Sequence, residues 1–247
     1  MNTHGNLTIA PHIHGFDDTE NLNPGYRSEF SVFVDFFKFK GFIINSLLGN
    51  TTLLSAPDKS QMQMDRIRYT LTPGFRYEFP SYYLKGAIHH ECIHTISRPE
   101  LNGSVWWNSL QIGCGTKGSS YLYLREEYKN VKNSFLNTWD AQINAGYILP
   151  ANRTLFSGQN HDYKYELFTV IRYHIGSFRK WALFSSLRQN VWMKKDKTLH
   201  HQLNVTFNMF RRGTVHFAGI FYNYTIYDSF LLDSTDGLGS VGIKILY

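Results

Sequence analysis

Residues 66–79 read RIRYTLTPGFRYEF, and polar and apolar side chains alternate along this stretch. Arginine, threonine and glutamate occupy even-numbered positions, whereas isoleucine, leucine and the aromatic residues occupy odd-numbered ones. Because successive side chains of a β-strand point to opposite faces of the sheet, the alternation predicts a strand with one polar and one apolar face. In a membrane barrel the apolar face contacts lipid and the polar face lines the interior.

The same alternation recurs along most of the chain. It is found in residues 28–38, 41–49, 82–96, 105–113, 121–128, 135–147, 163–175, 181–192, 199–210, 215–226 and 238–247, and more weakly in residues 7–13. Turn sequences separate several segments, at Pro80-Ser81, Gly176-Ser177 and Arg212-Gly213. Because single-chain bacterial barrels have an even number of strands, the pattern predicts an all-β fold, a closed antiparallel transmembrane β-barrel of about 12 strands.

The chain is expected to hold one membrane domain. Residues 27–247 form the predicted barrel, and residues 1–26 form an N-terminal segment that is either a short extra strand or a plug. The direction of the strands between Gly113 and Arg179 stays open, because the segments there do not alternate consistently if all short turns face the periplasm. Either one segment is not a strand, or one tight turn faces outward.

The composition agrees with a membrane barrel. Aromatic residues make up 16% of the chain, which suits a belt of aromatic side chains at each membrane interface. No run of about 18 apolar residues is present, so that we predict no transmembrane helix. The net charge of +6 comes from scattered basic residues, and we expect no nucleic-acid partner.

The end of the chain indicates a location. Residues 240–247 read SVGIKILY, which resembles the terminal β-signal of outer-membrane proteins, with a glycine, hydrophobic residues and a final aromatic residue. The resemblance implies a place in the bacterial outer membrane and insertion by the outer-membrane assembly machinery through the C-terminal strand. A closed sheet is one of the two structures that can span lipid, because it satisfies all of its backbone polar groups.

The side chains best suited to catalysis or binding lie within residues 82–96. Here His90, Cys92 and His94 alternate with other residues and share a face with aliphatic side chains, so that we assign them to the outer wall. If the following hairpin is centred near Glu100, Asn108 lies opposite Cys92. His90, Cys92 and Asn108 would then converge on the outer surface of the barrel.

This pattern resembles two families. His-x-Cys followed by Trp-Trp-Asn, within residues 87–110, resembles outer membrane phospholipase A, in which His-x-Ser and a downstream Trp-Asn form a triad on the lipid-facing surface. Over residues 65–128 and 181–247 the chain is more similar to an uncharacterised bacterial outer-membrane barrel family with a His-x-Ser-x-His stretch. The first resemblance implies a hydrolase of membrane lipid, and the second implies a location without an activity.

The first resemblance implies a catalytic set in which Cys92 attacks an ester carbonyl, His90 is the base and Asn108 orients the imidazole. The chain departs from both families because Cys92 stands where they carry serine. Glycine and aspartate are also absent after His94, and residues 97–104 are expected to form a longer loop than the phospholipase has. A thiol can replace a hydroxyl as nucleophile when an imidazole takes its proton.

Two other interpretations of the cluster stay open. His90 and His94 can be interfacial residues with Cys92 as a small filler, since most such residues are structural. Alternatively His90, Cys92 and His94 can share a metal ion, but no fourth ligand is evident and we assign no metal.

The opposite faces of the strands supply the expected interior. Its predicted lining residues are Arg66, Arg68, Arg76, Lys85, His89, Glu91, Asp140 and Arg172. Such residues either fill the interior as a mutually neutralised network or line a narrow channel for anions. The leading hypothesis is therefore a lipid acyl hydrolase acting on membrane lipid, and the alternative is a non-enzymatic barrel that serves as a narrow channel or structural component. Any cofactor, calcium dependence and the oligomeric state stay open.

Overall fold

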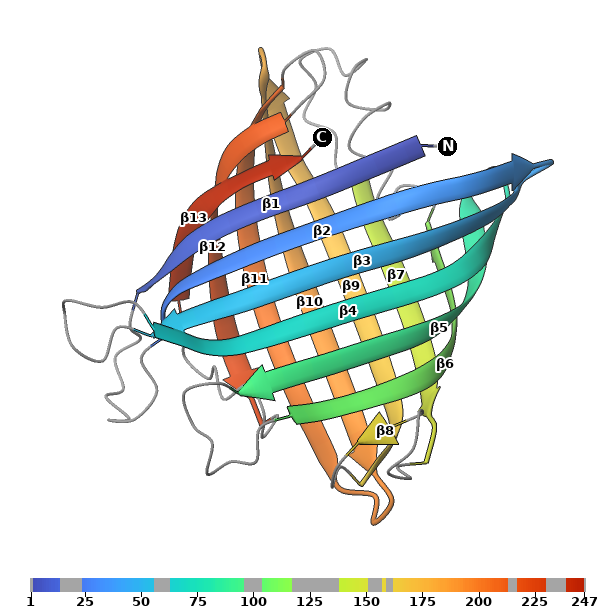
Figure 1. Cartoon of the computed structure of the whole chain (residues 1–247). Coiled ribbons are helices and arrows are strands. Elements are labelled where there is room, and N and C mark those ends of the chain that lie inside the picture. Colours follow the sequence, from blue (N-terminus) through green and yellow to red (C-terminus); the bar gives the residue numbers. More distant parts are fainter. Residues whose placement is uncertain are drawn as a thin grey trace.

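The computed structural model describes residues 2–13, 24–55, 63–95, 104–116, 138–150, 157–158, 162–212, 217–229 and 239–246. Thirteen strands form one sheet, as Figure 1 shows. They are β1 (Asn2–Ile13), β2 (Pro24–Phe39), β3 (Phe42–Ser55), β4 (Gln63–Glu78), β5 (Tyr82–Thr95), β6 (Ser104–Thr116), β7 (Thr138–Ile148), β8 (Ser157–Gly158), β9 (Tyr163–Phe178), β10 (Trp181–Lys194), β11 (Leu199–Arg212), β12 (Phe217–Asp228) and β13 (Gly239–Leu246). No helix among the described residues is long and apolar enough to cross a membrane.

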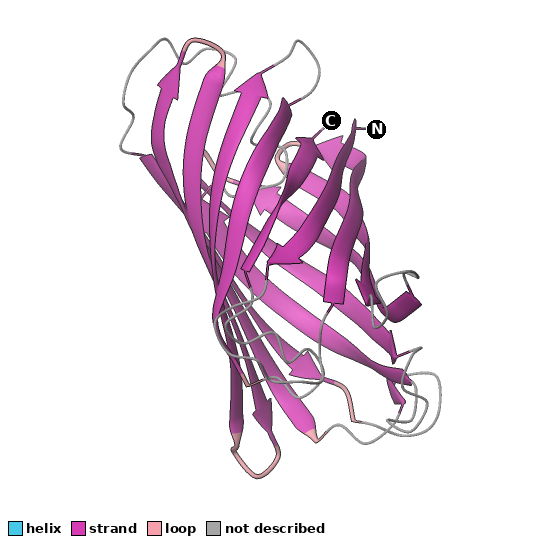
Figure 2. Ribbon diagram, turned by 90° about the vertical axis from the view of Figure 1, so that its left-hand side faces the viewer, coloured by secondary structure: helices cyan, strands magenta, loops and turns pink. Residues whose placement is uncertain are grey.

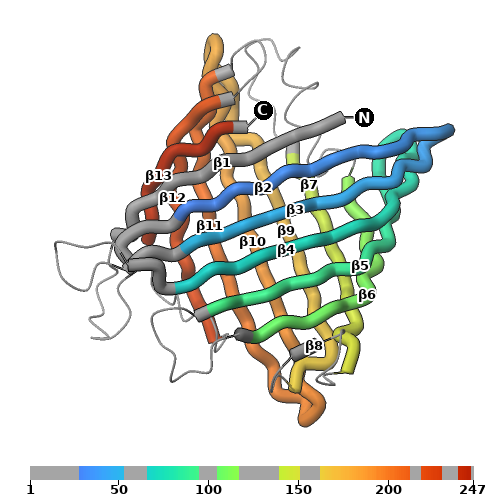
Figure 3. Tube along the Cα trace, viewed as in Figure 1, coloured from blue at the N-terminus to red at the C-terminus, as the bar shows by residue number. Residues whose placement is uncertain are grey.

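The sheet is an antiparallel meander, so the all-β prediction is confirmed. Each strand from β1 to β7 pairs with the next, β7 pairs with β9, and the succession continues to β13. The first and last strands also pair, with Asn6 opposite Leu246, which places the two chain ends side by side (Figures 1 and 3). The two-residue strand β8 pairs with the start of β6. Figure 2 shows that the tilted strands curve round a common interior.

The predicted strands match the observed ones with two exceptions. Residues 121–128 lie outside the described residues. The turn expected at Gly176-Ser177 was wrong, because β9 continues to Phe178 and the chain reverses at Arg179 and Lys180. A register irregularity between Leu183 and Phe184 keeps the longer strand in the ladder, and Arg179 adopts a left-handed φ of 50° in the turn.

Both chain ends contribute to the sheet. The segment expected to be an extra strand or a plug supplies β1 and the first residues of β2. Strand direction, which stayed open between Gly113 and Arg179, alternates regularly there, because β7 is antiparallel to both β6 and β9. The end of β6 therefore lies on the same side of the barrel as the chain termini and the turn between β4 and β5.

Exposure along the strands separates an outer face from an inner one. On β6, Ile112 is 72% exposed whereas Trp107 is 1% exposed. Exposed leucine, isoleucine and aromatic side chains occur on strands all round the sheet, for example Phe75 on β4, Ile171 on β9 and Ile220 on β12. Such a continuous apolar exterior is what a lipid bilayer requires of a barrel.

The inner face is less polar than the sequence pattern suggested. Besides charged residues it holds a buried apolar cluster of Ile93, Trp107, Ile148, Tyr163 and Trp192. These residues come from five adjacent strands, β5, β6, β7, β9 and β10, so that they pack together along one arc of the inner wall. The prediction of a polar lumen is therefore corrected to an interior that holds both polar and apolar side chains and is packed at this apolar cluster.

Candidate active site on the outer wall

The candidate residues alternate between the two faces of β5. Glu91 and its neighbour Ile93 are buried on the inner face. His90, Cys92 and His94 therefore lie on the outer face, at the end of β5 that is remote from the chain termini. Polar side chains in a lipid-facing wall cost free energy unless they are hydrogen-bonded, so their partners decide what they can do.

The strand β6 supplies Asn108, but in a different register from the one expected. Asn108 lies opposite His90, and Trp106 lies opposite Cys92. The expectation that Asn108 faces Cys92 was wrong by two residues, because it assumed a hairpin centred near Glu100, whereas the two strands pair in a register shifted from that one. A shift by two residues preserves the face of every side chain, and Asn108 therefore still points outward.

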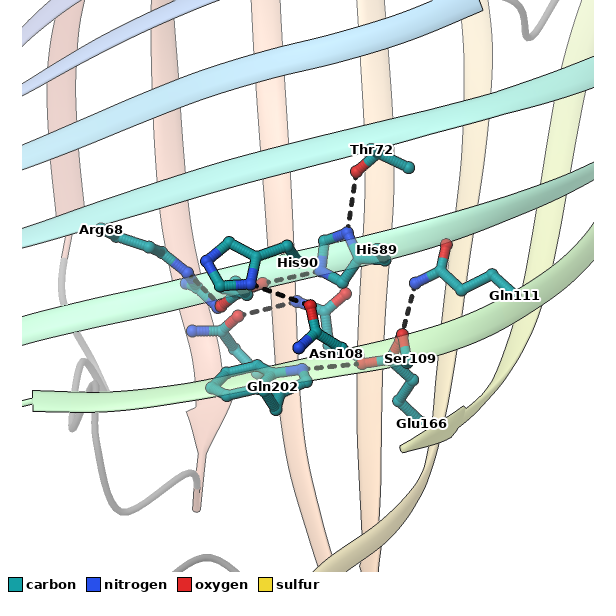
Figure 4. A network of polar contacts seen from close by, with 12 residues as sticks. Arg68, Thr72, His89, His90, Asn108, Ser109, Gln111, Glu166 and Gln202 are labelled. Atoms are coloured by element: carbon teal, nitrogen blue, oxygen red, sulfur yellow. Dashed lines mark hydrogen bonds and ion pairs between the residues drawn. The ribbon is translucent and has the colours of Figure 1, made fainter. Parts of the chain in front are cut away.

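The observed register brings His90 and Asn108 into direct contact. His90 Nδ1 lies 3.0 Å from Asn108 Oδ1. Figure 4 marks this hydrogen bond. Since an amide oxygen can only accept, Nδ1 of His90 donates, and Nε2 of the neutral imidazole keeps its lone pair. The ring of Trp106 lies beside His90, with centroids 6.4 Å apart. Asn108 thus orients an imidazole whose second nitrogen can act as a base.

The thiol is paired with the other histidine. Cys92 Sγ lies 2.9 Å from His94 Nε2, and the ring of His94 meets that of Tyr69 edge-on at a centroid distance of 5.9 Å. Cys92 is a free, partly exposed cysteine, as is the more exposed Cys114. The sequence patterns pointed to His94 only as an interfacial or metal-binding residue. Among the described residues, no three His, Cys, Asp or Glu side chains gather to hold a metal ion.

Directly behind this cluster, the inner face of β5 carries a charged network. Glu91 forms an ion pair with Arg68 and accepts a hydrogen bond from His89 Nε2 at 3.0 Å. The other ring nitrogen of His89 lies 2.9 Å from Thr72 Oγ1 (Figure 4). Both nitrogens of this inner histidine are therefore engaged, and the network joins β4 to β5.

A second inner contact joins β6 to β9 over the intervening strand β7, where Gly146 lies between Gln111 and Glu166 in the ladder and has no side chain. Glu166 accepts hydrogen bonds from Ser109, from Gln111 at 2.6 Å and from the Trp107 indole at 3.4 Å (Figure 4). The polar face of β9 was visible in the sequence, but nothing in a local pattern joins Glu166 to residues more than fifty positions earlier.

The remaining predicted lining residues also lie on the inner faces of their strands. Arg76 forms a two-pronged ion pair with Asp35 at 2.9 and 3.1 Å and a further bond to Glu78 at 3.0 Å. Arg66 is buried. Asp140 accepts a hydrogen bond from Thr116 at 2.8 Å and lies opposite Arg172 in the ladder. Lys85 lies on the same face of β5 as His89 and Glu91.

Comparison with known proteins identifies the fold. No family profile and no curated protein sequence matches the chain. Outer membrane phospholipase A from Escherichia coli superposes with a TM-score of 0.54 at 11% identity, over 99% of this chain and 89% of that one. The dimeric outer membrane phospholipase of Salmonella typhi with bound calcium gives 0.55 at 12% identity, over 98% and 89%.

A porin shares the fold as well. The KdgM porin superposes with a TM-score of 0.50 at 7% identity, over 99% of this chain and 98% of that one. At such identities the likeness establishes the fold alone, which is that of outer-membrane β-barrels. Together with the apolar exterior, it confirms the predicted outer-membrane location. An enzyme and a porin share this architecture, so the activity must be argued from the site.

Proposed function

We propose that the chain closes into a barrel of about 12 strands and hydrolyses acyl esters of membrane lipid at its outer wall. Closure is supported by the pairing of β1 with β13 and of β5 with β6, which leaves each long strand with a neighbour on both sides. The activity rests on one observation: the hydrogen bond from His90 to Asn108 lies beside Cys92 on the lipid-facing wall. We propose in addition that the chain is related to the outer membrane phospholipase A family through this site.

In this mechanism Cys92 is the nucleophile, His90 is a general base and Asn108 holds the imidazole in the required tautomer. The thiolate attacks the ester carbonyl carbon, and the acyl-enzyme is then hydrolysed by water. A site on the outer wall receives its lipid directly from the bilayer. This arrangement also gives a reason for polar groups on a surface where apolar ones are cheaper to hold.

The alternative is a non-enzymatic barrel that conducts small anions or has a structural role. The packing of the interior argues against an open channel. Trp107 and Trp192 are buried within it, and Glu166 of β9 is hydrogen-bonded to Ser109 of β6. Narrow barrels of this kind are filled by their own side chains.

The test uses the purified full chain in detergent micelles and in phospholipid vesicles. Fatty-acid release from phospholipid and from lipopolysaccharide is compared between the parent and Cys92→Ala, with and without calcium because the Salmonella phospholipase structure holds that ion. We expect release by the parent and none by the variant. Dye leakage from vesicles without lipid breakdown, equal in both proteins, would overturn the proposal in favour of a channel.

A further inference from the structure

Two imidazoles flank the thiol, and they have different partners. His90 and His94 lie two residues before and after Cys92 on one face of β5. His90 donates from Nδ1 to Asn108, whereas His94 turns its Nε2 toward the sulfur at 2.9 Å. A site with a single base needs only one of these rings. The geometry places the ring of His94 on the sulfur and the ring of His90 on the amide of Asn108.

We propose that the two histidines divide the reaction between them, and this inference rests on the proposed hydrolase activity. His94 takes the proton of Cys92 when the enzyme is acylated. His90, oriented by Asn108, takes a proton from the water that later releases the fatty acid. Both are catalytic residues in this scheme, because each exchanges a proton with a reacting atom.

In the acylation step, His94 first accepts a proton and then donates it. The thiol proton passes from Sγ to His94 Nε2, and the thiolate forms a bond to the ester carbonyl carbon. When the tetrahedral intermediate collapses, the bond from that carbon to the alcohol oxygen breaks, and the leaving oxygen takes the proton from His94. The products are a thioester on Cys92 and a free lysolipid, and His94 is neutral again.

In the deacylation step, His90 accepts a proton from water and later returns it to the sulfur. Water forms a bond to the thioester carbonyl carbon and gives one proton to His90 Nε2. The carbon–sulfur bond breaks, the fatty acid leaves, and the proton held by His90 returns to the sulfur directly or through water. Asn108 Oδ1 accepts a hydrogen bond from Nδ1 throughout, which stabilises the imidazolium that forms at this step.

The experiment compares the parent with His90→Ala, His94→Ala and His94→Gln, each in mixed micelles of dioleoyl phosphatidylcholine and detergent. Intact-mass spectrometry follows an oleoyl group on the protein, and peptide mapping locates it. We expect His90→Ala to accumulate oleoyl-Cys92 while fatty-acid release falls by roughly 10²-fold or more. Both His94 variants are expected to remain unacylated. Heat-modifiable migration on gels confirms that each variant is folded.

A second readout does not depend on turnover. Alkylation of Cys92 by iodoacetamide at neutral pH should slow by about tenfold in the His94 variants and stay unchanged in His90→Ala, because the ring next to the sulfur assists loss of its proton. Cys114 is the matched internal control, since it is an exposed thiol on the same wall. Its alkylation rate should be equal in all four proteins.

The possible failures are distinguishable. Acylation and alkylation at parental rates in the His94 variants would overturn the division, as would loss of acylation in His90→Ala, since His90 would then serve the first step. If the parent releases no fatty acid and acquires no acyl group, the proposed hydrolase itself fails. In that case unchanged alkylation in the His94 variants would also overturn the pairing of His94 with the thiol.

Discussion

The two faces of β5 carry histidines in opposite situations. On the inner face, His89 has one ring nitrogen on Glu91 and the other beside Thr72. On the outer face, His90 has one ring nitrogen on Asn108, and the proposed mechanism uses the other as a base. His89 and His90 are adjacent in the sequence but have different partners. These partners distinguish a structural histidine from a candidate catalytic one.

Substitutions on the inner and outer faces should have different consequences. Charges inside the barrel are paired and buried, and removal of one partner leaves the other without compensation. Polar residues on the outer wall lie at the edge of lipid, and their truncation leaves no internal cavity. We therefore expect inner substitutions to lower stability and outer ones to lower activity.

Cys92→Ala should have the largest effect. Fatty-acid release should fall by roughly 10³-fold or more, because the nucleophile is removed and members of a catalytic unit cannot substitute for one another. The measurement is release from phospholipid micelles, with the denaturation midpoint recorded in parallel and expected to be unchanged. Cys114→Ala is the control and should behave as the parent does. If Cys92→Ala released fatty acid at the parental rate, the outer wall would have no catalytic role and the interfacial interpretation would stand.

Arg76→Met should have the largest effect on the inner face. It leaves the buried Asp35 carboxylate without its ion pair, and the free energy of unfolding should fall by about 3–5 kcal/mol. Urea titration in lipid vesicles measures this loss. The double variant Asp35→Leu with Arg76→Met should recover most of it, because the Asp35 charge is then also absent and Glu78 keeps its ion pair with Lys38 at 3.3 Å. Equal stability of the single variant and the parent would contradict the division between faces.

Asn108→Ala should have an intermediate effect that is confined to activity. Loss of the acceptor lets the His90 ring rotate, and because His90 acts in deacylation, kcat should fall by about 10²-fold, the usual scale for a misplaced catalytic group. The stability should change little. Asn108→Asp retains an oxygen acceptor and should restore part of the activity. An alanine variant that matches the parent would show that the 3.0 Å contact is only structural.

Cys92→Ser should have the smallest effect. It introduces the residue that the resembling families carry, so hydrolysis should be retained or raised, as measured by the same release assay. The imidazoles and Asn108 keep their places in this variant. Activity as low as that of Cys92→Ala would mean that the chain does not share the mechanism of those families.

Much of this arrangement could be predicted from the sequence because the relevant signal is local. The alternation of residues 66–79 predicted a strand, and the same period of two assigned His90, Cys92 and His94 to one face of β5 and Glu91 to the other. The face of a side chain depends only on its parity within a strand, which neighbouring residues set. The mixed apolar interior was missed because alternation does not show which inner residues meet.

Tertiary structure decided the relations between strands. The sequence placed Asn108 opposite Cys92, and the ladder places it opposite His90, because register depends on the hairpin as a whole. The contact of Glu166 with Ser109 and Gln111 joins the two strands that flank β7, and it forms because Gly146, which lies between Gln111 and Glu166 in the ladder, has no side chain. By itself the sequence determined the strands, their faces and the outer-membrane location. The folded barrel alone decided which histidine meets the amide and which meets the thiol, since such contacts depend on the three-dimensional positions of side chains that no local period encodes.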